Sequence, residues 1–195
     1  MAQFPDEYDL NHSAVYTIDA RTCGDPDHDK SLRGHAGCYP ATVKDFVFED
    51  TKDRTNPATG MIRGLFRWLH EQFADSDQLP DRITITSLCI KGKHRSVALA
   101  VILEYILRHL GFSDVEVLHQ APSVGGWNTL CGKDVASLCR RCSTDLEDVD
   151  HDAHYEIFQY MMGLMFEAAH SILDYHLYFR DNKTAEDFST WMCEM

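Results

Sequence analysis

A short alternating segment, a basic turn and a long apolar segment follow one another between residues 83 and 110. Residues 83–88, ITITSL, alternate β-branched and polar positions, which predicts a strand. Residues 97–110 carry apolar side chains at helical spacing, which predicts a helix that ends near Gly111. A further strand is expected at 115–118, VEVL. Strand, helix and strand within about 40 residues form a βαβ unit with a parallel pair of strands.

The segments on either side of this unit extend the same pattern. Residues 15–18 predict another short strand, and a polar loop follows over 22–37. Helices are expected from Pro40 and over 61–73. We therefore expect an α/β fold, a small parallel-sheet sandwich that contains a βαβ unit. An amphipathic pattern over 153–179 adds a C-terminal helical tail.

The charge of the chain is uneven along its length. The whole sequence has 31 acidic and 18 basic residues, a net charge of −13, and residues 143–195 alone hold 12 acidic residues and 2 basic ones. We expect an α/β anion-binding domain over 1–142. Residues 143–195 would be an acidic helical tail that packs on the domain or on a partner subunit, which would give a homo-oligomer. The negative total disfavours nucleic acid as a partner.

The sequence also bears on where the protein is found. No apolar run approaches the roughly 20 residues that a membrane-spanning helix needs. Seven cysteines, an odd number, favour reduced thiols over the disulfide framework of a secreted protein. The first ten residues, MAQFPDEYDL, carry acids where a signal peptide would carry bases. We expect a cytoplasmic protein with no membrane partner.

The residues most informative about function, LCIKGKHRS at 88–96, stand between the predicted strand and helix. Such a turn brings backbone N–H groups and a helix N-terminus to one point, which favours a bound anion. Glycine lets the backbone turn tightly, and arginine can hold a phosphate through two parallel hydrogen bonds. We expect a phosphate- or carboxylate-binding loop, with a basic solvated turn as the alternative. The residues expected to contact the anion are Lys91, Gly92, Lys93, His94, Arg95 and Ser96.

The same turn has the Cys-x5-Arg spacing of protein tyrosine phosphatases, between Cys89 and Arg95. In those enzymes a thiolate of low pKa attacks phosphorus and the arginine holds the phosphoryl oxygens. Catalysis by Cys89 and Arg95 is therefore an alternative. However, Leu88 stands where that family usually has histidine, and Cys89 could simply pack as a small apolar residue. We lean towards a binding protein rather than an enzyme.

Two separated motifs in this order resemble the C-terminal domain of the RapZ family, the bacterial RNase adapter proteins and their relatives. The first comprises DAR at 19–21 and DKSLRG at 29–34, and the second is GKHRSV at 92–97. The GCYP turn at 37–40, which opens a helix, fits the family as well. The resemblance covers roughly residues 14–120. It implies a compact α/β domain whose anion pocket senses glucosamine-6-phosphate and which contacts a small RNA.

The resemblance also implies which residues form the pocket. The family loop usually reads Cys-Thr-Gly-Gly-x-His-Arg-Ser, whereas here Ile90 and Lys91 replace the threonine and the first glycine, which removes a hydroxyl and adds a charge. We predict a regulatory domain that binds a phosphosugar, with no cofactor required and with an RNA-associated adapter as a further alternative. The positions that the resemblance assigns to the pocket are Gly92, His94 and Arg95, with Arg21 and His28.

The cysteines near the predicted tail raise the question of a metal. Cys131, Cys139 and Cys142 are spaced Cys-x7-Cys-x2-Cys, and His119 lies upstream. Structural zinc takes four such ligands, and one Cys-x2-Cys supplies half of a site. The sequence leaves two interpretations open: a structural zinc held by these four residues, or ordinary reduced thiols. His151 and His154 are weaker alternatives for the fourth ligand.

Overall fold

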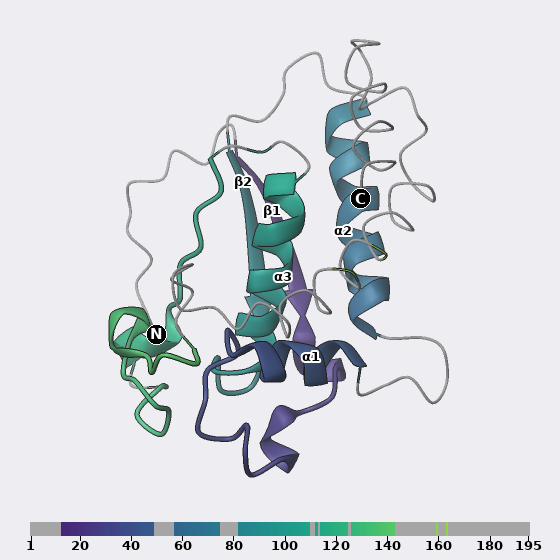
Figure 1. Cartoon of the computed structure of the whole chain (residues 1–195). Helices are drawn as coiled ribbons and strands as arrows, with labels where there is room; N and C mark the ends of the chain where they lie inside the picture. Colours follow the sequence, from purple (N-terminus) through teal and green to yellow (C-terminus); the bar gives the residue numbers. More distant parts are fainter. Residues whose placement is uncertain are drawn as a thin grey trace.

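The computed structural model describes residues 13–48, 57–74, 82–109, 112, 114–124 and 126–142, together with Gln159 and Gly163. These residues form a mixed α/β fold (Figure 1). Its strands and α-helices are β1 (Ser13–Asp19), α1 (Pro40–Phe48), α2 (Pro57–Ala74), β2 (Arg82–Leu88) and α3 (Arg95–His109). Short 3-10 turns occur at Ala20–Thr22, Pro26–His28, Ala121–Val124 and Val135–Ser137. Apart from Gln159 and Gly163, the predicted tail at 143–195 lies outside the described residues.

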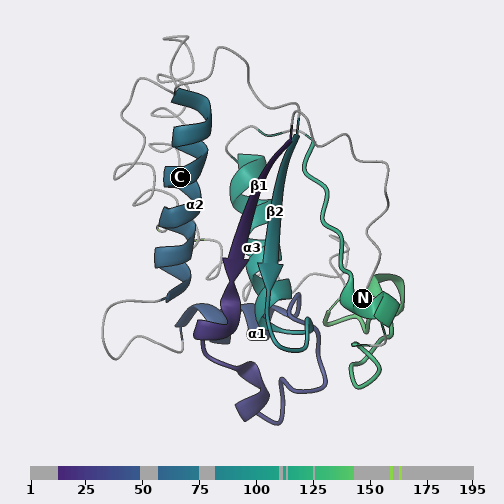
Figure 2. The same ribbon diagram turned by 180° about the vertical axis from the view of Figure 1, so that it is seen from behind.

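The two strands form a parallel pair over their whole length, from Ser13 opposite Arg82 to Asp19 opposite Leu88. Parallel strands need a long crossover connection, and here that connection contains α1 and α2. Both strands end at the same edge of the sheet (Figure 2). The loops that follow Asp19 and Leu88 therefore start next to each other, at the edge where α/β proteins bind their ligands.

The prediction of a third strand at 115–118 is wrong. Its backbone forms no strand ladder among the described residues, so the parallel pair is β1 with β2 and not β2 with this segment. Two observations explain the difference. The guanidinium of Arg108 donates a hydrogen bond to the Val115 carbonyl, which a ladder would need. The side chain of Leu118 is 70% exposed, so packing against the core does not hold this segment beside the sheet.

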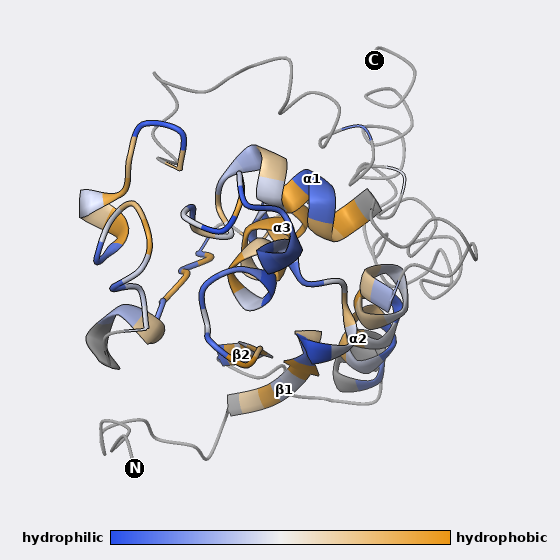
Figure 3. Ribbon diagram, turned by 90° about the horizontal axis from the view of Figure 1, so that it is seen from below, coloured by the Kyte–Doolittle hydropathy of each residue, from blue (hydrophilic) through white to orange (hydrophobic). Residues whose placement is uncertain are grey.

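All three helices lie on one face of the two-stranded sheet, with α2 nearest β1 (Figure 3). Alternation along the strands turns Ile18 and the half-buried Ile85 inward and leaves Val15 exposed. In α2 and α3 the buried residues recur at positions i, i+3, i+4 and i+7, the spacing of a single helix face. They include Ile62, Leu65, Phe66 and Leu69 in α2, and Leu99, Ile102, Leu103 and Ile106 in α3. Burying each such side chain stabilises the fold by about 1.5–3 kcal/mol.

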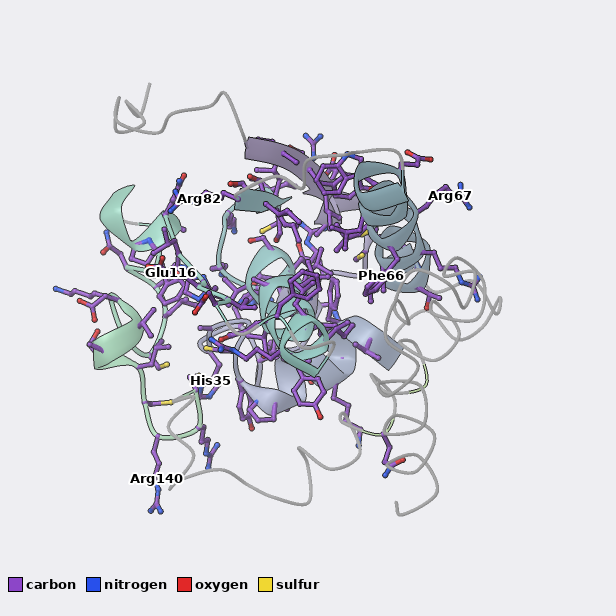
Figure 4. The ribbon with its side chains drawn as sticks, turned by 90° about the horizontal axis from the view of Figure 1, so that it is seen from above. His35, Phe66, Arg67, Arg82, Glu116 and Arg140 are labelled. Atoms are coloured by element: carbon purple, nitrogen blue, oxygen red, sulfur yellow. The ribbon has the colours of Figure 1, made fainter. Side chains whose placement is uncertain are left out.

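Figure 4 shows the outcome of this spacing on α2. Phe66 points toward the centre of the molecule and is buried, while its neighbour Arg67 points away and is exposed.

None of the described helices is both long enough and apolar enough to cross a membrane.

Candidate functional site

The turn between β2 and α3 winds around the sulfur of Cys89. The backbone N–H of Gly92 donates to this Sγ at 3.2 Å, and the Ser96 hydroxyl lies 3.1 Å from it. Gly92 has a φ of 61°, in the left-handed region that favours glycine, which lets the chain reverse before α3 begins. Ser87 at the end of β2 donates its hydroxyl hydrogen to the Ser96 carbonyl at 2.6 Å, which ties the strand to the first turn of the helix.

The loop after β1 packs against this turn. Asp25 caps the short 3-10 turn Pro26–His28 by accepting a hydrogen bond from the Asp27 N–H at 3.2 Å. Further along the loop, the N–H of Gly37 donates to the Lys93 carbonyl at 2.8 Å. The two loops that begin at the same sheet edge are therefore joined at the start of α3.

A cavity of about 60 Å³ lies between the two loops. One carboxylate of the lining has three basic neighbours: Asp27 lies 3.1 Å from the Lys93 ammonium, 3.3 Å from His94 Nδ1 and 3.6 Å from the Lys91 ammonium. Lys91 is mostly exposed, whereas Lys93 and His94 are buried. The cavity is lined by Asp25, Asp27, Cys89, Ile90, Lys91, Lys93, His94 and Arg95.

Arg95 is buried and holds the two loops together. Its guanidinium lies 3.2 Å from an Asp25 carboxylate oxygen and donates to the backbone carbonyls of Arg21 at 3.0 Å and Cys23 at 3.2 Å. Because buried charges need partners, these contacts explain how an arginine can lie inside the domain. The guanidinium is thus positioned at the cavity wall by the β1 loop rather than free to move.

The ionic contacts change the proton affinities of this cluster. Burial acts to raise the pKa of Asp27, but the Lys93 hydrogen bond and the charges of His94, Lys93 and Lys91 outweigh it and lower that pKa. Burial, and then the charge of Lys93, lower the pKa of His94, while Asp27 acts against them. Asp27 is therefore ionised and His94 mostly neutral near pH 7, and the fixed cations of the cavity are Lys91, Lys93 and Arg95.

Cys89 has a thiol that is more acidic than usual. Burial acts to raise its pKa, but hydrogen bonds from the Ser96 hydroxyl and from backbone N–H groups of Ser96, Gly92 and Lys91 outweigh this and lower it. The cavity therefore has a thiol with enhanced thiolate character in its wall, opposite the loop that carries Asp25 and Asp27.

The structure places some of the predicted ligand residues away from the cavity lining. Arg21 is exposed, and its guanidinium pairs with Asp19, so it contributes its backbone carbonyl rather than its charge. His28 lies 4.0 Å from Asp45, and its Nδ1 lies 2.6 Å from the Asp25 carbonyl oxygen. Gly92 and Ser96 shape the turn from behind the lining residues, around the Cys89 sulfur.

The sequence interpretation did not include Asp25 and Asp27 among the site residues. They come from a loop more than 60 positions before the basic turn, so local spacing gave no reason to join them. One signal was present in the sequence: a loop rich in aspartate followed a strand that could lie beside the strand of the basic turn.

A second group of side chains could hold a metal ion. One donor atom from each of His35, Cys131, Cys139 and Cys142 lies within 4.8 Å of all the others. The structure thus gathers the three cysteines of the sequence motif with His35. His119, the histidine named from the sequence, is not in the group. Its ring packs against Trp127, with centroids 5.4 Å apart. His151 and His154 lie outside the described residues.

Comparisons with known proteins identify the family of the chain. The family model described as the RapZ C-terminal domain matches residues 2–122, more than half of the chain. A protein of Stenotrophomonas maltophilia (strain K279a), named as a nucleotide-binding protein, is 32% identical over 107 residues, which cover 55% of this chain and 35% of that relative. The chain thus matches only about a third of the relative's length. No solved structure matches the chain significantly. Because the family match spans both strands, all three helices and the basic turn, this chain belongs to the RapZ C-terminal domain family.

Proposed function

We propose that this protein is a regulatory binding domain that holds a phosphorylated small molecule, such as an amino-sugar phosphate, at the turn between β2 and α3. The observation that carries the proposal is that Lys91, Lys93 and Arg95 line one cavity at the N-terminus of a 15-residue helix. Backbone N–H groups and the helix dipole add to the attraction for an anion there. The family supports the same ligand class, because the domain binds phosphosugars in RapZ.

The size of the cavity indicates which part of such a ligand it would hold. A volume of about 60 Å³ has room for a few water molecules or a tetrahedral oxyanion. A whole phosphosugar is larger, so its sugar ring would extend past the exposed residues at the rim. Ile90, which is 73% exposed, and Lys91 form that rim.

The ligand would compete with the carboxylates that now face the cations. Asp27 accepts from Lys93 and lies near Lys91, and Asp25 pairs with Arg95. A phosphate dianion carries more charge than one carboxylate, so we expect it to take over the exposed Lys91 first. Binding by this exchange weakens as ionic strength rises.

The test is calorimetric titration of the full chain with glucosamine-6-phosphate, inorganic phosphate and phosphate-free glucosamine. We expect the two phosphates to bind and glucosamine not to bind. Lys91→Ala should weaken binding about tenfold, the equivalent of one charge-assisted hydrogen bond. The matched control is Lys133→Ala, which removes an exposed lysine that does not line the cavity. The absence of phosphate binding, or equal affinities in the two variants, would contradict the proposal.

A nucleotide belongs in the same titration panel. The relative from Stenotrophomonas maltophilia is named as a nucleotide-binding protein, but only about a third of its length is matched here. The cations of the cavity would attract a nucleotide through its phosphates as well. Preference for the amino-sugar phosphate over a nucleoside monophosphate would show that the amino-sugar ring is recognised in addition to the phosphate.

Phosphate-ester hydrolysis is a second candidate, because Cys89 and Arg95 line the same cavity and the pKa of Cys89 is lowered. In that reaction the thiolate would form a bond to phosphorus while the alcohol leaves and takes up a proton. Water would then attack the phosphorus and break the phosphorus–sulfur bond, which releases phosphate and restores the thiolate. The proton donor is the weak point: the lowered pKa of Asp27 keeps it ionised, and Asp25 is paired with Arg95. We therefore rank binding above hydrolysis. An aryl-phosphate assay decides between them, because turnover that Cys89→Ser abolishes would favour the enzyme.

RNA binding has less support. The cations that line the cavity are paired with Asp25 and Asp27, so they do not form an open basic surface. The whole chain has a net charge of −13. We expect RNA retention on a filter to be weak and to disappear with modest salt.

A further inference from the structure

We propose that His35, Cys131, Cys139 and Cys142 form a tetrahedral zinc site that fastens the segment 126–142 onto the domain. Structural zinc in proteins is held by four cysteine and histidine ligands, and sets of three cysteines with one histidine are common. The four donor atoms converge within 4.8 Å of one another although they come from segments about 100 residues apart. This site is separate from the proposed anion pocket and does not depend on it.

Three of the six distances between the donor atoms are close to those expected around one tetrahedral ion. His35 Nδ1 lies 3.2 Å from the Cys142 sulfur and 3.5 Å from the Cys139 sulfur, and the Cys131 and Cys142 sulfurs are 3.5 Å apart. With usual zinc bond lengths, the donors of a tetrahedral site lie about 3.5–3.8 Å from one another. The observed distances are within a few tenths of an ångström of these values.

Zinc explains this arrangement better than a disulfide does. A bond between Cys131 and Cys142 would use two sulfurs and leave His35 and Cys139 with no reason to point at the same place. The Cys131 and Cys142 sulfurs are farther apart than the roughly 2.05 Å of a disulfide. With zinc, every member of the group has a role, and the thiols lose their protons to the solvent on binding.

The surroundings show why the segment would need such a fastener. Between residues 126 and 142 the described chain has no strand and no α-helix, and its one regular element is the 3-10 turn Val135–Ser137. Trp127 and Cys142 are fully buried in a small cluster with Ala36, Cys38 and Val97. A zinc ion supplies folding free energy in segments whose apolar core is too small to hold them.

Figure 4 shows His35 lying between the main body of the domain and the segment that carries Arg140, whose side chain points outward. The backbone strengthens the same junction, because the Cys131 N–H donates to the Gly34 carbonyl at 2.8 Å. Two residues after His35, the Gly37 N–H donates a hydrogen bond to the Lys93 carbonyl of the basic turn. The zinc site therefore steadies the loop that supplies Asp25 and Asp27 to the cavity.

The position of the site along the chain makes it a feature beyond the family domain. The family match ends at residue 122, and all three cysteine ligands follow it, whereas His35 lies inside it. The cysteine segment thus extends the domain and reaches back to a loop of the domain for its fourth ligand.

The first experiment uses inductively coupled plasma mass spectrometry to measure the metal content of the full chain, purified under reducing conditions without chelators. We expect about one zinc per chain. Exchange for Co²⁺ should give thiolate-to-cobalt charge-transfer bands and the visible absorption of a tetrahedral ion. A wild-type chain without bound zinc that also fails to take up Co²⁺ would overturn the proposal, as would a Cys131–Cys142 disulfide found by peptide mass mapping.

Variants assign the ligands. Cys139→Ser and His35→Ala should lose the zinc, and His35→Cys should keep it, because four cysteines also form a zinc site. His35→Cys thereby separates loss of a ligand from loss of the fold. The matched control is His119→Ala, a histidine outside the group, which should keep full zinc content. Retention of zinc by both Cys139→Ser and His35→Ala would overturn the assignment. Because metal content is the measurement, this result is independent of whether phosphate binds.

Discussion

At the scale of single residues, the chemistry of the candidate site depends on where hydrogen-bond donors point. Cys89 and Arg95 have the Cys-x5-Arg spacing that is visible in the sequence, but spacing alone does not set the pKa of a thiol. The structure adds the Ser96 hydroxyl at 3.1 Å and the Gly92 N–H at 3.2 Å. Donors that stabilise the thiolate lower the pKa of the thiol.

We predict that Cys89 is alkylated faster near neutral pH than an ordinary cysteine. Its lowered pKa means that a larger fraction is thiolate at a given pH, so the midpoint of the alkylation rate against pH lies below the ordinary value of about 8.5. Ser96→Ala removes the hydroxyl donor and should move the midpoint upward. The measurement is iodoacetamide labelling over a pH series, with Cys89 followed by peptide mass spectrometry. A midpoint at or above the ordinary value would contradict the prediction.

At the scale of elements, the start of α3 is decided by a close backbone contact. Gly37 donates to the Lys93 carbonyl, and a β-carbon at Gly37 would lie 2.1 Å from the His94 carbonyl oxygen and 2.7 Å from the Ala98 nitrogen. Both of these atoms belong to the backbone, so neither can rotate away as the end of a flexible side chain could. The loop after β1 can approach α3 this closely because position 37 has no side chain.

Gly37→Ala should therefore destabilise the protein by about 1–3 kcal/mol or more, the usual cost of overpacking. Gly60→Ala is the matched control, because Gly60 lies in α2 with no atom within 4 Å of an added β-carbon. That change should stabilise the fold by roughly 0.5–1 kcal/mol, the difference in helix propensity. Urea unfolding of the three proteins measures both effects. Equal destabilisation by the two changes would show that the contact at Gly37 has no special role.

The sequence predicted α1, α2, α3 and both observed strands because each has local periodicity, and it placed the basic turn correctly between a strand and a helix. It failed at 115–118, where alternation alone suggested a strand. Pairing depends on a free neighbouring edge and on free carbonyls, and Arg108 occupies the Val115 carbonyl. Whether a short alternating segment pairs is a property of the packed molecule.

At the scale of the whole molecule, the buried His94 and the half-buried His119 make stability depend on pH. Burial lowers the pKa of His94, with Lys93 as a second cause, and burial lowers that of His119. The unfolded chain, with histidine pKa values of about 6.5, then binds more protons than the folded chain as the solution becomes acidic. The contribution of these two histidines to the free energy of unfolding is therefore fully present above the unfolded pKa of about 6.5. It is lost as the pH falls below that value towards the lower pKa values of the folded protein.

We expect the urea concentration at the midpoint of unfolding to decrease when the pH is lowered from about 7.5 to about 5.5, a range that spans the ordinary histidine pKa. His119→Asn removes one of the titrating groups and should reduce the fall without abolishing it, because His94 remains. The check is a set of equilibrium unfolding curves at several pH values, with the slope against urea constant. A midpoint that rises on acidification would show that the signs of these pKa shifts are wrong.

The sequence by itself determined what depends on neighbours along the chain. Helical and alternating periodicity marked the elements, the loop composition marked a candidate anion site, and Cys-x7-Cys-x2-Cys marked three candidate ligands of a metal ion. The tertiary structure decided what depends on parallel pairing of β1 with β2. That pairing brings Asp25 and Asp27 against the basic turn, and folding brings His35, rather than His119, to the three cysteines. Partners of this kind are separated by tens of residues in the chain, so only packing selects them.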